Sequence, residues 1–454
     1  MTGAPESVSL ASIQPAFEGV IPATIASCSA DGIPNVTYLS IVRRIDSERI
    51  ALTNQFLTKT AHNIRDNPHV LVRVVHPDDM SQYDLQSCYL HSETSGELFE
   101  SVRVQLDAIA AQTGMTGTFR LRSLDILRVD RCSRVGDALS ATRIDRERRP
   151  LSSLGVFVRR LAASEDLAEA TRVGCESLDD LFGFRHSMVL LADDATQHLF
   201  VVEAHGYDQG RVGAEVAVGE GLIGVAAQRR QTVRVTNMTR TRTFAAAASG
   251  GDLHEVPLRG LDDAQSLVAA PMMLQDRLIG VLYLDSPRPG TFDADAADIV
   301  DVIAGHLAVT VALLEAGGSE PNERHQPMAD PSSPTGPPTG PQTEPTTSRP
   351  RQVQFHSSDG SLFIDGEYII RGVPGRILFR LLAEHLQSGR TQFSNKELRL
   401  DRTIELPIGN DNLEARLLVL RRRLAERGGL IAIERIGRGR IELTVSGPLE
   451  LQQQ

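Results

Sequence analysis

Three consecutive polar residues, Thr58, Lys59 and Thr60, place two hydroxyl groups and one cation just before a predicted short helix. We expect this helix to stop at Pro68, because the residue before a proline disfavours helical backbone. A hydroxyl group, a cation and a helix N-terminus all favour a phosphate dianion. These three residues therefore indicate a place where a phosphate group can bind.

A second group of charged side chains lies near the C-terminus. Arg421, Arg422 and Arg423 fall in a predicted helix, and Arg438 and Arg440 flank a glycine in a predicted turn. From residue 351 onward the chain has 16 Lys and Arg against 13 Asp and Glu, a balance of +3, whereas residues 1–350 carry −14. The sign of this C-terminal part favours a polyanionic partner. An arginine run on a helix is also compatible with a simple solvated face.

The cysteines and histidines do not indicate a metal site. The four cysteines lie at least 43 residues apart, and His186, His198, His205 and His254 share no metal-ligand spacing. Few and scattered cysteines suit a reducing cytosol. The first 25 residues do not resemble a signal peptide, and no window of 18 residues is continuously apolar. We therefore expect a cytoplasmic protein with no bound metal and no membrane partner.

The elements that position these residues fall into three predicted domains. The chain has 454 residues, of which 41% are hydrophobic and 23% charged, and this globular composition excludes collagen-like, wholly disordered and disulfide-stapled classes. Nine of the 23 prolines lie in residues 317–350, so we predict a disordered linker there. The predicted parts are domains at 1–135, 151–316 and 351–447, a connector at 136–150 and the linker at 317–350.

In the first domain, alternating apolar segments predict strands at Pro22–Ser27, Asn35–Val42, Arg49–Thr53 and Val70–Val75. A helix is predicted from about Gly96 to Gln112. The turn Asp31-Gly32-x-Pro34, the strand end Thr53-Asn54 and the run from Thr58 to Pro68 appear in the same order as in the FMN-binding split-barrel family typified by pyridoxamine 5′-phosphate oxidase. The first domain resembles that family over about 115 residues.

The resemblance implies FMN as a cofactor. It implies that Thr58, Lys59 and Thr60 hold the FMN phosphate, and that the strand from Thr37 to Ser40 runs along the isoalloxazine. The family usually has a Ser-Arg-Lys-like triplet, so Thr60 replaces one expected cation. The alternative is a barrel that serves as a scaffold without flavin. No cluster of histidine, arginine and carboxylate indicates a second substrate site, so the sequence favours a role other than catalysis without deciding against an enzyme.

The second domain resembles a GAF domain over about 165 residues. The resemblance rests on Gly219-x-Gly221-Leu-Ile-Gly224 and on Leu278-Ile-Gly280-Val-Leu-x-Leu, which lie in this order between predicted terminal helices. Both glycine groups indicate tight turns and close backbone packing, so we assign them no catalytic role. GAF domains bind small molecules or serve as dimer modules. The resemblance therefore implies a small-molecule ligand under a covering segment, residues 238–261, and a homodimer.

The third domain resembles the winged-helix output domain of response regulators over about 90 residues. A strand hairpin precedes three predicted helices, the second opened by a capping box at Ser394 and the third spanning Asp411–Arg427. A terminal hairpin then turns at Gly437-Arg438-Gly439. In that family the third helix enters the DNA major groove and the wing contacts the backbone. The implied DNA-binding residues are Arg416, Val419, Arg421, Arg422, Arg423, Arg438 and Arg440.

The face of the third helix expected to read bases carries Leu418 and Val419, which are apolar. Such side chains contact thymine methyl groups, but exposed apolar residues also mark protein contacts. A winged helix that binds protein is therefore the alternative to one that binds DNA.

Together these patterns predict an α+β multidomain protein: a split β-barrel, a GAF α/β sandwich with an antiparallel sheet, and a C-terminal winged helix. The predicted function is that of a cytosolic sensory and transcriptional regulatory protein, in which the first two domains sense a small molecule or redox state. The alternative function is a flavin-dependent oxidoreductase with accessory regulatory domains.

Overall fold

The computed structural model divides the chain into two compact units. The first unit contains a seven-stranded and a six-stranded sheet, and the second contains two smaller sheets. The structure describes residues 7–454 except 40, 55–57, 115–119, 136–150, 194–195, 208–210, 242–257, 259, 318–349, 407–411, 428–429 and 438. The predicted connector, and the predicted linker from residue 318 to 349, lie outside the described residues.

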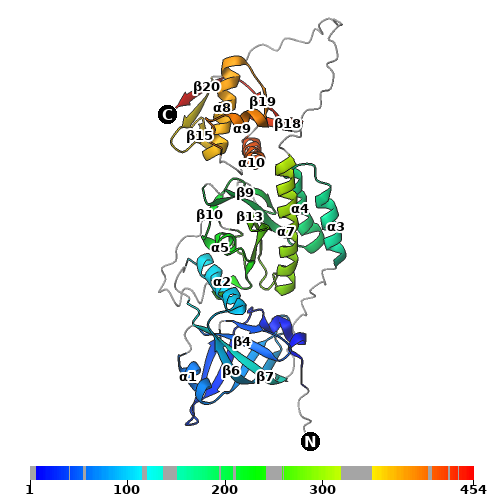
Figure 1. Cartoon of the computed structure of the whole chain (residues 1–454), viewed down its shortest axis with the longest axis vertical. Coiled ribbons are helices and arrows are strands. Elements are labelled where there is room, and N and C mark those ends of the chain that lie inside the picture. Colours follow the sequence, from blue (N-terminus) through cyan, green and yellow to red (C-terminus); the bar gives the residue numbers. More distant parts are fainter. Residues whose placement is uncertain are drawn as a thin grey trace. The chain divides into compact units, whose positions relative to one another are not determined.

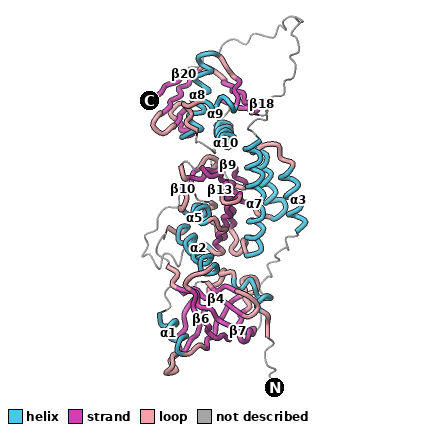
Figure 2. The backbone as a smooth tube through the Cα atoms, in the orientation of Figure 1, coloured by secondary structure: helices cyan, strands magenta, loops and turns pink. Residues whose placement is uncertain are grey.

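The seven-stranded sheet is antiparallel and curled, as expected for a split barrel (Figure 2). Alternate residues of β1 and β5 are buried, the period of a strand with one core face. The core of this sheet includes Ile25, Val72 and Leu85 and is joined by the short helix η1 (Leu10–Phe17). In spatial order the strands are β2 (Pro34–Leu39), β1 (Ala23–Cys28), β5 (His69–Val75), β6 (Gln82–Glu93), β7 (Ser123–Val135), β4 (Arg49–Asn54) and β3 (Val42–Arg44).

The prediction of one continuous strand over Asn35–Val42 is wrong. The structure divides this segment into β2 and β3, which form the two opposite edges of the sheet. β2 pairs with β1, whereas β3 pairs with β4, with Val42 opposite Leu52. An apolar run of this length does not show where the chain passes from one edge to the other, because both halves have strand-like residues.

Helix α2 (Glu97–Gln112) belongs to two hydrophobic cores of the first unit. Phe99, Val102 and Leu106 pack with residues of β4 and β7. A second stripe, which includes Val104 and Ala108, packs into the core of the six-stranded sheet. The spacing of each stripe is three or four residues, so the two stripes lie on different sides of one helix. Figure 1 shows α2 running beside α5.

The six-stranded sheet is also antiparallel, with spatial order β10-β9-β8-β13-β12-β11. Helices α3, α4 and α7 lie side by side along one face of this sheet, and α5 and α2 lie on the other (Figures 1 and 2). Its elements are α3 (Leu151–Ala162), α4 (Leu167–Phe182), β8 (His186–Asp193), β9 (His198–His205), β10 (Glu215–Ala217), α5 (Gly221–Arg229), β11 (Val233–Val235), β12 (Ser266–Leu274), β13 (Arg277–Ser286) and α7 (Ala294–Gly317).

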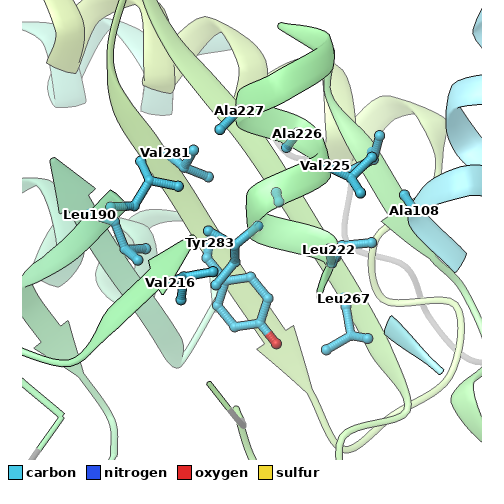
Figure 3. Packing of buried hydrophobic residues seen from close by; sticks show 14 of the residues in the cluster. Ala108, Leu190, Val216, Leu222, Val225, Ala226, Ala227, Leu267, Val281 and Tyr283 are labelled. Carbon is cyan, nitrogen blue, oxygen red and sulfur yellow. The ribbon is translucent and has the colours of Figure 1, made fainter. Parts of the chain in front are cut away.

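Figure 3 shows the core between this sheet and α5. Leu190 and Val281 of the strands, Leu222 and Val225 of α5 and Ala108 of α2 belong to one cluster, in which Val225 lies on the side of Ala108. The predicted helical segment Leu151–Phe182 is divided into α3 and α4, since residues 163–166 leave the helical conformation.

The glycines of the second domain lie in a tight turn and at close backbone contacts, as the sequence predicts. A Cβ atom on Gly224 would lie 2.3 Å from the carbonyl oxygen of Ala217, and one on Gly280 would lie 2.0 Å from that of Leu190. Gly219 has a positive φ of 94°, a conformation that glycine adopts without strain. These glycines are therefore required by close backbone packing and a tight turn, and the structural interpretation is confirmed.

The second unit contains a four-stranded sheet in the order β16-β15-β14-β20 and a three-stranded sheet in the order β17-β19-β18. Strands β14 and β20 are parallel neighbours, so the last strand returns to the first of this unit. The elements are β14 (Arg351–His356), β15 (Ser361–Ile364), β16 (Glu367–Ile370), α8 (Gly372–Ser388), β17 (Gln392–Ser394), α9 (Asn395–Leu400), α10 (Leu413–Ala425), β18 (Ile431–Gly437), β19 (Arg440–Val445) and β20 (Leu449–Gln453).

The sequence signals of this unit match the structure locally. Ser394 caps α9 through a capping box with Glu397, as expected. Leu413, Leu417, Leu420 and Leu424 of α10 are all buried, which confirms the apolar stripe. Strand β20 lies beyond residue 447, the predicted end of the domain, because a parallel partner far along the chain leaves no local turn signal.

Candidate functional site

The polar run that indicates a phosphate site lies at the start of α1 (Thr58–Asp66). The helix begins at Thr58, so the run forms its first turn and does not precede it as expected. Lys59 is exposed, whereas Thr60 is 3% exposed and its Oγ1 accepts a hydrogen bond from Asn35 Nδ2 at 2.9 Å. The side chain of Thr58 lies outside the described residues. Lys59 thus presents its charge to solvent beside the first N–H groups of the helix, which have no partner within it.

The second part of the predicted flavin site lies on β2. Thr37 is half-buried and lies two residues from Asn35, so both side chains share one face of the strand. Because Asn35 contacts Thr60, the fold brings this face of β2 to the first turn of α1. Ser40 lies outside the described residues. The opposite face of β2 exposes Val36 and Tyr38, which are 68% and 73% exposed.

A buried polar cluster in the second domain was not identified from the sequence. Asp285, at the end of β13, is 1% exposed. Its carboxylate accepts hydrogen bonds from Tyr207 Oη at 3.0 Å, Tyr283 Oη at 3.3 Å and the backbone N–H of Leu261 at 2.8 Å. Its only sequence signal is an acidic residue at the end of an apolar strand, which is too common to single out.

Burial is the largest influence on this carboxyl group and raises the pKa of Asp285 above its ordinary value, although its hydrogen-bond donors act in the opposite direction. A Cβ atom on Gly260 would lie 1.8 Å from Asp285 Oδ2, so the backbone at Gly260 and Leu261 approaches the carboxylate as only glycine permits. The cluster therefore fixes the end of the predicted covering segment above the sheet. Most of that segment, residues 242–257 and 259, lies outside the described residues.

The predicted DNA-binding residues do not form one exposed face. Arg416 and Val419 are 4% and 3% exposed, and Leu418 is 5% exposed. This contradicts the expectation that Leu418 and Val419 are exposed to read bases. α10 is apolar on most of its circumference, so a helical wheel gives no means of separating its outer face from its buried one.

The arginine run of α10 is largely engaged within its own unit. Arg421 Nε donates to the carbonyl oxygen of Ile433 in β18 at 3.1 Å. Arg423 pairs with Glu426 at 3.2 Å. Arg422 is half-buried. The Arg421 contact attaches α10 to the terminal hairpin, and the burial and pairing of the run leave little of it to face a polyanion.

The terminal hairpin holds the more accessible basic residues. Arg440 is exposed at the start of β19, and Arg438 lies outside the described residues. The backbone N–H of Asn395 donates to the carbonyl oxygen of Gly439 at 2.9 Å, so the turn of the hairpin lies against the start of α9. Lys396, the next residue of α9, is exposed. The hairpin turn and the start of α9 therefore carry two exposed cations close together in the fold.

Two findings, on metal ligands and on membrane-spanning helices, concern the described residues alone. Among them, no group of three or more His, Cys, Asp and Glu side chains is arranged to hold a metal ion. One described helix, at Ala294–Glu315 within α7, is long and apolar enough to cross a membrane by length and composition. Its residues Val300, Ile303 and Leu307 are fully buried, as in a helix that packs on a sheet.

Comparison with protein families supports the first two domains. Residues 11–129 match the family model for pyridoxamine 5′-phosphate oxidase, and residues 164–312 match the model for the GAF domain. The chain thus carries a pyridoxamine 5′-phosphate oxidase-like domain followed by a GAF domain, in the predicted order.

The individual proteins and solved structures that match this chain are similar to only part of it or at low sequence identity. An uncharacterized protein of Methanocaldococcus jannaschii is 34% identical over 58 residues, which is 12% of this chain and 39% of that protein. The chain thus spans about two fifths of the length of this curated relative. Among solved structures, the GAF domain of an Acinetobacter phosphoenolpyruvate-protein phosphotransferase is 21% identical and covers 37% of this chain and 95% of its own, with a TM-score of 0.32. An FMN-binding protein of Syntrophomonas wolfei is 16% identical and covers 28% and 88%, with a TM-score of 0.24.

Proposed function

We propose that this protein is a sensory regulator whose split barrel and GAF domain respond to a small molecule or redox state, and whose C-terminal unit is a winged-helix output that binds DNA. The observation that carries the proposal is the combination of a GAF domain with a C-terminal unit of a particular element order. That unit runs from a strand hairpin through α8, α9 and α10 to the hairpin of β18 and β19. This is the element order of a winged helix.

The DNA contact in this proposal differs from the one expected from the sequence. Val419 is buried, so we do not propose that it reads bases. The exposed cations at the hairpin turn and the start of α9, Arg440 and Lys396, are the groups that would contact phosphate. Phosphate contacts position a protein on DNA and carry no sequence information themselves.

The proposed DNA binding is tested by asking which genomic DNA fragments the full chain retains. One retained fragment is then titrated at several salt concentrations. For Arg440→Ala and Lys396→Ala, each lost phosphate contact should lower the magnitude of the salt slope by about 0.9. Arg351→Ala is a control, because Arg351 is also exposed but pairs with Asp365 at the far sheet of the unit. A folded protein that retains no DNA at low salt rules out the DNA output and favours a protein-binding winged helix.

FMN is the proposed cofactor of the split barrel. Lys59, beside the N–H groups of α1, fits a phosphate dianion, and Thr37 lies on the strand face that meets this turn. Bound FMN would supply redox chemistry, and the residues of the chain would hold and orient it. A yellow protein that oxidises a reduced nucleotide would favour the alternative function, a flavin-dependent oxidoreductase. A colourless protein that takes up no added FMN would favour a scaffold without flavin.

A homodimer is the proposed assembly. β2 is an edge strand of the barrel and exposes Val36, Tyr38 and neighbouring Ile33, which is 56% exposed. An edge strand with apolar exposed side chains is a surface that proteins usually cover. Sedimentation of the full chain tests this assembly, and a monomer at micromolar concentration would contradict it.

A further inference from the structure

The four-stranded sheet of the second unit has α8 on one of its faces. Phe355 of β14 is 5% exposed and stacks on Phe379 of α8, with the two ring centroids 4.2 Å apart. Side chains alternate between the two faces of a strand, so the neighbours of Phe355, Gln354 and His356, lie on the opposite face. The residues of this opposite face belong neither to the proposed DNA contact nor to the proposed flavin site.

Three aromatic rings lie together on this opposite face. Phe363 of β15 is opposite Gln354 in the strand register, and Tyr368 of β16 is opposite Phe363. The ring centroid of Phe363 lies 5.4 Å from that of His356 and 5.6 Å from that of Tyr368, in edge-to-face arrangements. Tyr368 is 39% exposed, and His356 and Phe363 are half-buried. The three rings therefore form an aromatic surface that a ligand can reach.

Glutamines continue this surface toward the edge strand β20. Gln354 lies opposite Gln452 of β20 in the register, and both side chains are half-buried. Each side-chain amide has two N–H donors. The surface thus combines aromatic rings with hydrogen-bond donors, and we call its five residues the aromatic face: Gln354, His356, Phe363, Tyr368 and Gln452.

Charged side chains lie at the margin of the aromatic face. Arg351 pairs with Asp365 at 3.0 Å, and Arg427 pairs with Glu367 of β16. Glu450 is exposed on β20, two residues before the last glutamine of the aromatic face. Because the face itself consists of aromatic and amide groups, it is suited to an uncharged partner.

The segment that leads into this sheet is rich in proline. β14 begins at Arg351, directly after the predicted linker, whose residues 318–349 lie outside the described residues. In the sequence, Pro331, Pro334 and Pro337 are spaced by three residues. No Asp, Glu, Lys or Arg occurs in residues 331–343. The linker therefore contains an uncharged stretch with a regular proline repeat.

The polyproline II conformation explains why such a repeat fits the aromatic face. This helix has three residues per turn and rises about 3.1 Å per residue, so prolines three apart share one side and lie about 9 Å apart. The two centroid distances of 5.4 and 5.6 Å give the aromatic cluster a comparable length. The backbone carbonyls of a polyproline II helix have no internal partners, so glutamine amides can donate to them. Proline-rich segments are recognised on aromatic-lined surfaces of this kind.

We propose that residues 331–341 of the linker bind the aromatic face of their own chain in the polyproline II conformation. Proline rings contact His356, Phe363 and Tyr368, and the two glutamines donate to backbone carbonyl oxygens. This contact does not depend on whether the second unit binds DNA or the barrel binds FMN.

The length of the intervening chain allows this contact. Residues 342–350 separate the proline repeat from β14, and in the polyproline II conformation they span up to about 28 Å. The four-stranded sheet is only about 15 Å wide, since neighbouring strands lie about 4.8 Å apart. A short connection also gives the repeat an effective concentration of the order of millimolar at the aromatic face. A contact that is weak between separate molecules is therefore sufficient within one chain.

The test uses a tryptophan as a reporter in the full chain, which has none of its own. Tyr368→Trp places the reporter on the aromatic face, and acrylamide quenching measures its accessibility. In a second version of this variant, Pro331, Pro334 and Pro337 are replaced by alanine. If the face is occupied at least half of the time, the quenching constant should rise at least about twofold in the second version. An unchanged quenching constant overturns the proposal.

Two controls separate docking from general effects of the substitutions. Replacing Pro321 and Pro327 by alanine alters the same linker outside the proposed segment and should leave the quenching constant unchanged. Tyr38→Trp places the reporter on the barrel, where Tyr38 is 73% exposed, and the proline replacements should not change its quenching. Circular dichroism confirms that the variants fold. An equal rise in either control overturns the assignment to the aromatic face.

The glutamine contacts have their own test. Gln354→Glu replaces two N–H donors with a carboxylate, so it should raise the quenching constant of the reporter as the proline replacements do. Gln387→Glu is the matched control, because Gln387 is exposed on α8, and it should have no effect. A Gln354→Glu variant that stays as shielded as the natural chain overturns the assigned hydrogen bonds.

Added peptide and dilution identify the source of the bound segment. A peptide of residues 331–341 should lower the quenching constant of the proline-replaced chain again in a saturable manner, and a peptide with alanine at the three repeat positions should not. Equal effects of the two peptides overturn the proposal. Shielding by the natural linker should not depend on protein concentration. Shielding that is lost on dilution assigns the bound segment to a second copy and overturns the contact within one chain.

Discussion

Replacing Asp285 by alanine tests whether the buried polar cluster holds the covering segment in place. The substitution removes an acceptor from Leu261 N–H, Tyr207 Oη and Tyr283 Oη. Tyr207 and Tyr283 each make a further contact, whereas the N–H of Leu261 loses its acceptor at 2.8 Å. A buried donor without a partner costs about 1–3 kcal/mol, so the substitution should cost roughly 1–3 kcal/mol at neutral pH. The substitution also removes a carboxylate whose charge is costly to bury, and this makes the net loss smaller.

The assay is native-state hydrogen exchange of amides in β12 and β13 of the full chain, converted to opening free energies. Amides of β5 and β6 serve as an internal control, because they belong to the core of the other sheet. We expect Asp285→Ala to lower the opening free energy in β12 and β13 alone. Asp285→Asn should lower it less, because its side-chain oxygen still accepts from one donor.

The wild type and Asp285→Asn differ in opening free energy, and the pH dependence of this difference tests whether the protonation of Asp285 controls it. The pKa of Asp285 is raised in the folded state, so its stabilising contribution is fully present below the ordinary pKa of an aspartate and is lost as the pH rises through the raised value. The wild type should therefore exceed Asp285→Asn in opening free energy by more at acid pH than at neutral pH. A difference that grows with pH, or that does not change, would refute this reasoning.

Four further predictions address separate features. Lys59→Ala should weaken FMN binding by roughly 1.5–3 kcal/mol, the range for a charged hydrogen bond, as measured by flavin fluorescence. Gly280→Ala should destabilise the GAF domain by at least about 1–3 kcal/mol, because the new Cβ atom would overlap a backbone carbonyl, and thermal melting checks this. Tyr38→Asp should weaken the homodimer in sedimentation experiments, since it places a charge on an exposed apolar edge. Ser394→Ala should remove the cap of α9 at a cost of about 1 kcal/mol in thermal unfolding.

The site residues show how far sequence reasoning reaches. The run from Thr58 to Thr60 could be placed near a helix start because its residues are consecutive and lie beside the local helix signals. The Asp285 cluster could not be identified, because the donors of Tyr207 and Leu261 lie 78 and 24 residues from Asp285 along the chain. The exposure of Leu418 and Val419 was predicted wrongly, since a mostly apolar helix does not reveal which of its faces is covered.

The sequence by itself determined the local elements, the order of the first two domains and the positions where glycine is required. These follow from periodicity, caps and turns, which act between residues close along the chain. Only the tertiary structure decided that β2 and β3 lie at opposite edges of the barrel, that α2 serves two cores, and that Asp285 is buried beneath Gly260 and Leu261. Such features depend on which distant segments pack together. Apolar packing is non-directional, so similar local patterns are compatible with several such arrangements.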